Sequence, residues 1–167
     1  MLQVAGRRFW LAVHIGSSVG WIGAVMAFIV LDVTTVASDN VGVLRACYVA
    51  MDLVTRWAIV PLALAAFATG LIIALGTKWG LFLHYWVVIS LILTVASTLV
   101  LLVQVPLIAH RASMASDPMT RDAAIQGMGN LLLHSVGGAA VLVVVMVLNI
   151  YKPRGLTRRG MRKQEPT

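Results

Sequence analysis

Charged residues and cysteine are scarce in this chain. Only 11% of its 167 residues are charged, whereas soluble domains carry about 25%. Cys47 is the single cysteine, which excludes an internal disulfide, a C-x-x-C pair and a C-x-x-C-H haem attachment motif. Hydrophobic residues make up 60% of the sequence and the mean hydropathy is +0.92. One water-soluble core of this size cannot bury so much apolar surface, so the lipid bilayer is the expected solvent.

Four long stretches without Lys, Arg, Asp or Glu alternate with short charged segments. They lie between Arg8 and Asp32, Arg56 and Lys78, Lys78 and Arg111, and Asp122 and Lys152. Each is at least as long as the roughly 20 residues that a helix needs to cross the hydrocarbon. Lipid offers backbone groups no partner, so a span made by one segment must be helical. The prediction is an all-α integral membrane four-helix bundle with spans near 9–31, 57–76, 81–105 and 124–151.

The four predicted spans leave no room for a second domain, so residues 1–151 are expected to form one transmembrane unit. The first apolar run is longer than the apolar core of a secretory signal, and three more runs follow, so it is interpreted as a retained span. Residues 152–167 contain Pro153 and Gly155 and are rich in Lys and Arg. This tail is predicted to be basic and disordered, and to lie close enough to touch anionic lipid headgroups.

Lysine and arginine set the predicted orientation. With four spans, both termini and the turn at Lys78 share one side of the membrane. That side holds nine of the 13 Lys and Arg residues: Arg7, Arg8, Lys78, Lys152, Arg154, Arg158, Arg159, Arg162 and Lys163. Positive residues accumulate on the cytoplasmic side, so both termini are predicted to be cytoplasmic in a multi-pass protein of the cell membrane. The positive net charge then requires no nucleic-acid partner.

The connections between spans carry their own signals. The segment DNVGVLRACYVAMDLVTR before the second span is predicted to be helical, with Asp39 or Asn40 as its cap. Asp52 and Arg56 stand at positions i and i+4 of that helix and are expected to pair. Pro106 is predicted to kink or end the third span.

The segment HIGSSVGWIGA, residues 14–24, contains a serine-hydrolase motif. Gly16, Ser18 and Gly20 match G-x-S-x-G, but a nucleophile elbow needs a strand, a strained turn and a helix, with an acid and a base nearby. Here the serine lies in the middle of a predicted helix without a neighbouring carboxylate. The hydrolase interpretation is therefore rejected.

A helical wheel separates the same segment into two faces at 100° per residue. One face carries His14, Ser17, Ser18 and Trp21, and the opposite face carries Gly16, Gly20 and Gly23. The glycines predict close packing against a helix of this chain or of another subunit, as in a homo- or hetero-oligomer. The other face would direct the histidine and Trp21 toward the interior.

The four histidines lie in or beside the predicted spans. At about 1.5 Å per residue from the cytoplasmic edge, His14 sits at ~9 Å and His84 at ~8 Å. His134 comes out near ~27 Å, and His110 near ~46 Å, outside the hydrocarbon. Two neutral imidazoles at one level suit the axial positions of haem iron or a transition metal. The alternative is that each histidine forms hydrogen bonds between helices.

Haem b is the better match, because no Cys, Asp or Glu lies at that level to complete a metal site. Arg8, with Arg7 and Lys78, would then meet the haem propionates. His134 is a candidate for a second, outer haem or metal. Gly127, Asn130 and Gly138 lie on its side of the helix and leave room for a flat ligand or for a neighbouring helix.

A polar stripe follows the third span. It consists of Ser90, Thr94, Ser97, Thr98 and Gln104. Such side chains can line a path, but in membrane proteins they often bond to their own backbone or across helices. The packing interpretation is favoured.

His14, Trp21 and Gly23 spell H-x-x-x-x-x-x-W-x-G, which resembles the first helix of copper-resistance-D-like bacterial membrane proteins. The same opening is similar to that of the four-helix protoporphyrinogen oxidases of HemJ type, and WGLFLHYWVV resembles the start of their third helix. His84 stands near the lysine of that family, a departure that argues against the oxidase activity itself. The resemblance implies a b-type haem bundle of a bacterial inner membrane with His14 as an axial ligand.

Three hypotheses follow. The first is a haem b protein with His14 and His84 as ligands, a membrane oxidoreductase in electron transfer or oxidase-like chemistry with a quinone or a respiratory partner. The second is a copper-handling membrane protein, although the eight methionines form no M-x-x-M pattern. The third is a cofactor-free accessory or structural subunit that docks through Gly16, Gly20 and Gly23.

Overall fold

The computed structural model describes residues 3–77 and 80–162, and most of them are helical. The helices are α1 (Val4–Ala37), α2 (Val41–Val54), the π-helical turn η1 (Thr55–Ile59), α3 (Val60–Gly76), α4 (Tyr85–Ser116), α5 (Asp122–Gln126), α6 (Leu132–Tyr151) and α7 (Arg158–Arg162). Since α2, η1 and α3 are continuous, four helices are long and apolar enough to cross a membrane. The all-α prediction is confirmed, and the four helices are compatible with an integral membrane protein.

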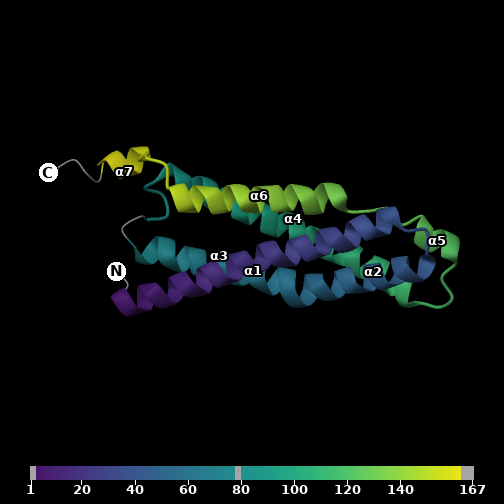
Figure 1. Ribbon diagram of the computed structural model, residues 1–167. Helices are drawn as coiled ribbons and strands as arrows, with labels where there is room; N and C mark the ends of the chain where they lie inside the picture. The colour runs from purple at the N-terminus through teal and green to yellow at the C-terminus, as the bar shows by residue number, and fades with distance from the viewer. Residues whose placement is uncertain (1–2, 78–79, 163–167) are drawn as a thin grey trace.

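The four long helices run side by side, with the start of α1 and the short α7 at the same end (Figure 1). α1 packs against α2, α3 and α6, and α4 packs against α2, α3 and α6. α1 and α4 are therefore diagonal to each other, with the second span and α6 between them. The shared end of α1 and α7 agrees with an even number of spans, while the cytoplasmic orientation stays a prediction.

The second long helix begins at Val41, well before the predicted start of its span. The Asn40 side chain caps it, because Oδ1 accepts hydrogen bonds from the N–H groups of Gly42 at 2.9 Å and Val43 at 3.3 Å. The expected pair also forms, with Arg56 Nε 2.8 Å from Asp52 Oδ1. The helical interpretation of this segment is confirmed.

Pro106 does not end the third long helix, which continues to Ser116. The proline is exposed, so its ring and the missing N–H lie on the outer side of α4. Beyond it, Ile108, Ala112 and Ala115 are buried at 5%, 6% and 4% exposure. A membrane helix tolerates a proline where neighbouring helices hold the following turns, and here α2 packs against α4.

The fourth span is shorter than its charge-free run. α5 covers Asp122–Gln126, and α6 starts only at Leu132 rather than near residue 124. Gly129 separates the two with a φ of 67°, in the left-handed region that glycine adopts readily. The apolar run alone could not reveal this break.

Arg45 of α2 holds the connection between α4 and α5. One guanidinium nitrogen donates to the carbonyl oxygens of Ala115 at 3.1 Å and Asp117 at 2.9 Å. The other donates to the Thr120 carbonyl at 2.6 Å and to the Asp122 carboxylate at 3.3 Å. A single side chain thereby satisfies carbonyl groups at and beyond the end of a helix, which otherwise lack partners.

The tail differs from the predicted disordered segment as far as the structure describes it. Thr157 donates from its N–H to the Leu83 carbonyl at 3.0 Å and from Oγ1 to the Phe82 carbonyl at 2.6 Å. The Tyr85 N–H donates to the Gly155 carbonyl at 3.3 Å. Residues 152–162 are therefore ordered against the segment before α4, because that segment offers backbone groups that no helix uses. Lys163 and the residues after it lie outside the described part.

Candidate functional site

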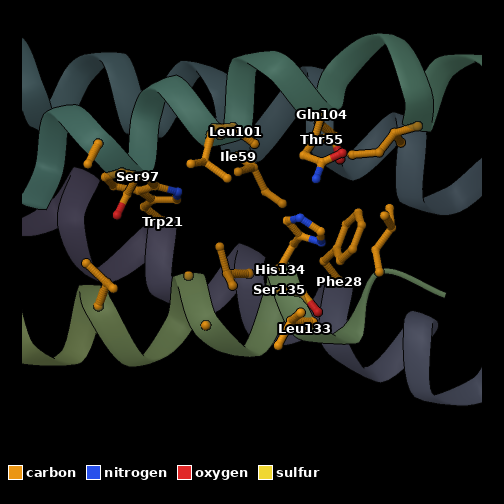
Figure 2. Close-up of a pocket in the computed structure, with 18 of the residues that line it drawn as sticks. Trp21, Phe28, Thr55, Ile59, Ser97, Leu101, Gln104, Leu133, His134 and Ser135 are labelled. Carbon is orange, nitrogen blue, oxygen red and sulfur yellow. The ribbon is translucent and has the colours of Figure 1, made fainter.

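A cavity of about 400 Å³ lies between α1, η1, α4 and α6 (Figure 2). Its size falls within the range of about 300–1,000 Å³ that is usual for small-molecule sites. The lining residues are uncharged and mostly aliphatic or aromatic. All four walls are parts of candidate membrane spans.

α1 contributes one continuous face to the cavity. Trp21, Val25 and Phe28 are buried at 4%, 8% and 5% exposure and all line it. Their spacing of four and three residues places them on one side of a helix. The wheel face that carries Trp21 in the sequence therefore does point inward, and its aromatic ring meets this cavity.

The π-helical turn η1, between α2 and α3, forms one wall of the cavity. The N–H of Val60 donates to the carbonyl of Thr55, five residues back, which is the bond of a π-helix. Pro61 follows directly and has no N–H, so the regular ladder cannot continue through it. Thr55 and Ile59 of this turn both line the cavity, and such turns are frequent at functional sites.

Five polar side chains line the cavity besides Trp21: Thr55, Ser97, Gln104, His134 and Ser135. Thr55 donates its hydroxyl to the Met51 carbonyl at 2.7 Å, and Ser135 lies 3.3 Å from both the Asp32 carboxylate and the Leu132 carbonyl. Within the described part of the chain, no hydrogen bond is formed by the side chains of Trp21, Ser97, Gln104 and His134. Gln104 of α4 is half-buried and His134 of α6 is exposed, so both could meet a ligand.

His134 stands in the first turn of α6, and its ring extends toward the cavity beside Phe28 (Figure 2). The sequence singled out His134 for the space that small residues would leave around it. Gly137 and Gly138 of α6 do line the cavity, and a Cβ at either would meet nothing within 4 Å. The structure therefore leaves open space beside Gly137 and Gly138. A second haem or a metal at His134 stays a prediction.

Asp32 fixes the start of α6 from behind the cavity. It is fully buried, and its two oxygens lie 3.0 and 3.2 Å from the N–H of Leu131. Ser135 donates to the same carboxylate. Asp32 does not line the cavity, but it positions the turn that carries His134.

His14 packs against α3. Its Nδ1 lies 3.0 Å from the Ala66 carbonyl and 3.1 Å from Thr69 Oγ1. Thr69 gives its own proton to backbone carbonyls, at 2.6 Å to Ala65, and a carbonyl only accepts, so Nδ1 carries the hydrogen. Nε2 is then the nitrogen available to another donor or to a metal.

His84 is the residue before α4 rather than a part of it. Its backbone pairs with Leu156 of the tail, and its ring centroid lies 6.4 Å from that of Trp86. Neither His84 nor His14 lines the cavity. The Nδ1 hydrogen bond of His14 to a carbonyl is of the kind that a metal-ligating histidine commonly forms with its other nitrogen. The pairing of His14 with His84 stays a prediction.

The remaining predicted ligands are not gathered at one place. No group of three or more His, Cys, Asp or Glu residues within 3–77 and 80–162 could hold a metal ion. Arg8 is exposed in the second turn of α1, His110 is exposed near the end of α4, and Lys78 lies outside the described residues. Copper binding gains no support from this arrangement.

The three glycines of the predicted packing face of α1 have different surroundings. A Cβ at Gly20 would meet Leu62 of α3 at 3.3 Å, so this glycine packs within the molecule. A Cβ at Gly16 or Gly23 would meet nothing within 4 Å. Docking of another subunit on Gly16 and Gly23 stays a prediction.

Sequence reasoning missed three features of this region. From the sequence, Gln104 is interpreted as a packing residue, Asp32 only marks the end of a charge-free run, and no π-helical turn is predicted. Pro61, which stands inside a predicted span, was the available signal for that turn. A lone carboxylate at the edge of an apolar run was the signal for Asp32, since intramembrane carboxylates usually pair with a defined partner.

No family model, no curated protein and no solved structure matches this chain significantly. The resemblance to copper-resistance-D-like proteins and to HemJ-type oxidases therefore rests on the short motifs alone.

Proposed function

We propose that this protein is a multi-pass membrane protein that binds a neutral, lipid-soluble ligand in the cavity between α1, η1, α4 and α6. The supporting observation is that His134 and Gln104 line a mostly apolar cavity and have no hydrogen-bond partner in the described part of the chain. His134 is exposed and Gln104 half-buried, so a ligand that covers them would have to replace the hydrogen bonds that they form with solvent. A ligand with a compact polar head would satisfy both groups.

The lining narrows the chemical class of the ligand. No Lys, Arg, Asp or Glu lines the cavity, so an anionic or cationic head would lose its hydration without a counter-charge from these residues. Imidazole and carboxamide groups both donate and accept hydrogen bonds, which suits carbonyl or hydroxyl oxygens. Trp21 and Phe28 offer flat surfaces for a ring. A quinone, the partner expected from the sequence, meets these requirements.

A binding measurement tests the proposal. The protein, purified in a mild detergent, is titrated with a short-chain ubiquinone analogue, and its unfolding temperature is followed. We expect a saturable increase for the wild type, because a ligand that binds only the folded state stabilises it. His134→Leu and Gln104→Leu should each weaken binding several-fold, since each removes one polar contact.

His110→Leu is the matched control, because it changes an exposed histidine outside the cavity. It should bind the analogue as the wild type does. The proposal would be abandoned if the unfolding temperature did not respond to the quinone, or if all three variants bound it equally.

Haem b at His14 is the second candidate, and the Nδ1 hydrogen bond to the Ala66 carbonyl is what favours it. Bound haem would supply one-electron chemistry, and His14 would hold it through Nε2. Oxidised and reduced visible spectra of protein purified with haem supplementation test this. A Soret band that disappears in His14→Ala and persists in His110→Ala would support it. A protein without the band would leave the cavity proposal standing and remove this one.

A further inference from the structure

The segment 152–162 does not trail away from the end of α6. Lys152 has a left-handed φ of 45° directly after Tyr151, so the chain leaves the helix axis there. The backbone of Leu156 then pairs with that of His84, and Thr157 bonds to Phe82 and Leu83. Thr157 Oγ1 also accepts from the N–H of Gly160 at 3.2 Å. One side chain thus ties α7 to the segment that precedes α4.

Gly160 brings α7 into direct contact with that segment. It is buried, and a Cβ at this position would overlap the backbone oxygen of Leu83 and touch Leu156. A backbone oxygen inside a bonded segment cannot move aside as a flexible side chain can. Only glycine at position 160 allows α7 to pack this closely against Leu83. The sequence therefore specifies the position of α7.

Seven described cationic residues stand at this end of the molecule: Arg7, Arg8, Lys152, Arg154, Arg158, Arg159 and Arg162. The five carboxylates of the described part belong to Asp32, Asp39, Asp52, Asp117 and Asp122, none of them on the segments at this end. Glu165 lies outside the described residues. The three arginines of α7 are exposed, whereas Gly160 is buried. The packing of Gly160 against Leu83 therefore leaves the three guanidinium groups accessible at the surface.

If α6 crosses the bilayer, α7 lies at the level of the membrane surface. It lies just beyond the end of α6, near the start of α4 (Figure 1). Tyr151, the last residue of α6, is 79% exposed, and tyrosines at the ends of spans sit at the headgroup level. Met161 of α7 is 50% exposed and offers an apolar side chain beside the arginines. A lipid phosphate at this level would meet arginines that are already positioned.

We propose that α7, docked through Thr157 and Gly160, is a binding site for the phosphate headgroups of anionic phospholipids, with Arg158, Arg159 and Arg162 as its cations. Arginine suits phosphate because its planar guanidinium donates two parallel hydrogen bonds. Basic residues beside a span attract anionic lipids. The docked backbone adds a fixed arrangement, which a flexible basic tail would lack. The proposal is independent of what the cavity binds.

Native mass spectrometry of the full chain provides the test. The protein is released from micelles that contain equal amounts of phosphatidylglycerol and phosphatidylcholine, and the retained lipids are counted. We expect the wild type to retain phosphatidylglycerol preferentially. Replacing Arg158, Arg159 and Arg162 together by Gln should reduce that preference roughly tenfold or more. Inorganic phosphate at millimolar concentration should not displace the lipid, because it lacks the acyl chains that hold the headgroup at this level.

Two variants separate a docked site from general positive charge. Gly160→Ala keeps every charge but displaces α7 from Leu83, and we expect it to lose most of the preference. Arg121→Gln at the opposite end removes one exposed charge and should leave the preference unchanged, and circular dichroism verifies that each variant remains helical. Unchanged lipid retention in Gly160→Ala, or in the triple Gln variant, would overturn the proposal, as would displacement by phosphate alone.

Discussion

The carboxylate of Asp32 accepts a hydrogen bond from the backbone N–H of Leu131, 99 residues further along the chain. This contact joins the end of α1 to the residue that precedes α6, and Ser135 adds a second bond to the same carboxylate. The start of α6 is one side of the cavity and carries His134. A single buried acid therefore connects the packing of two helices to the geometry of the candidate binding site.

Replacing Asp32 tests this connection. Asp32→Leu removes the acceptor and leaves the Leu131 N–H buried without a partner. We expect a loss of about 2–4 kcal/mol in the free energy of unfolding, because each lost hydrogen bond contributes about 0.5–1.5 kcal/mol and the orphaned donor adds a desolvation cost of about 1–3 kcal/mol. Denaturant titration in detergent micelles measures it. Asp39→Leu, which changes an exposed acid on the α1–α2 connection, should cost less than about 0.5 kcal/mol. Equal losses in the two variants would refute the structural role of Asp32.

Arg45 offers a test of geometry rather than charge alone. Its guanidinium reaches four oxygens on the connection between α4 and α5. Arg45→Lys retains the charge, but an ammonium group cannot reproduce the forked arrangement. We expect Lys to restore less than half of the stability that Arg45→Ala loses, about 2–3 kcal/mol. Full restoration by Lys would show that charge is sufficient. Limited proteolysis of the 117–121 connection gives a local measurement, with faster cleavage expected in both variants.

The sequence predicts the long helices well because each depends on a property that is local in the chain. An apolar run of sufficient length, an Asn cap at residue 40 and a charged pair at Asp52 and Arg56 all act within a few residues of one another. The break before α6 depends on Gly129 and on a carboxylate from α1. No window of sequence contains both of these groups, so the predicted fourth span begins too early.

The cavity was less predictable for the same reason. Gln104 lies in a polar stripe, and the periodicity of a single helix cannot distinguish a hydroxyl that bonds to its own backbone from an amide that lines a cavity. Thr98 does bond to the Thr94 carbonyl at 2.8 Å, so the packing interpretation is confirmed for that residue. The sequence pairs His14 with His84 by their estimated heights along separate helices. Height carries no information on direction, and the His14 ring turns toward α3.

The contact between His14 and Gly70 provides a measurable coupling. A Cβ on Gly70 would lie 3.1 Å from Cε1 of His14, so the imidazole must shift in Gly70→Ala. In the background of His14→Ala this conflict disappears. We expect Gly70→Ala to be more favourable in that background by about 0.5–1 kcal/mol, measured as a double-mutant cycle of unfolding free energies. Gly16→Ala, whose Cβ would meet open space, should show no coupling. A coupling free energy of zero between Gly70→Ala and His14→Ala would mean that the His14 ring does not pack against α3.

The last prediction concerns the space in the cavity itself. Gly138 lines the cavity, and a Cβ at this position would meet nothing within 4 Å, so the side chain of Gly138→Leu starts in open space. Glycine in a helix interior is about 1 kcal/mol less favourable than residues with good helix propensity. We therefore expect this variant to be at least as stable as the wild type in thermal unfolding.

The same substitution should abolish binding of the quinone analogue, because the new side chain occupies part of the roughly 400 Å³ that the ligand needs. Ala140→Leu is the matched control, since it adds comparable bulk to an exposed position of α6 that does not line the cavity. It should bind the analogue normally. Stability and binding thus move in opposite directions at Gly138, an outcome that general damage to the fold cannot produce. Retained affinity in Gly138→Leu would place the ligand elsewhere in the molecule.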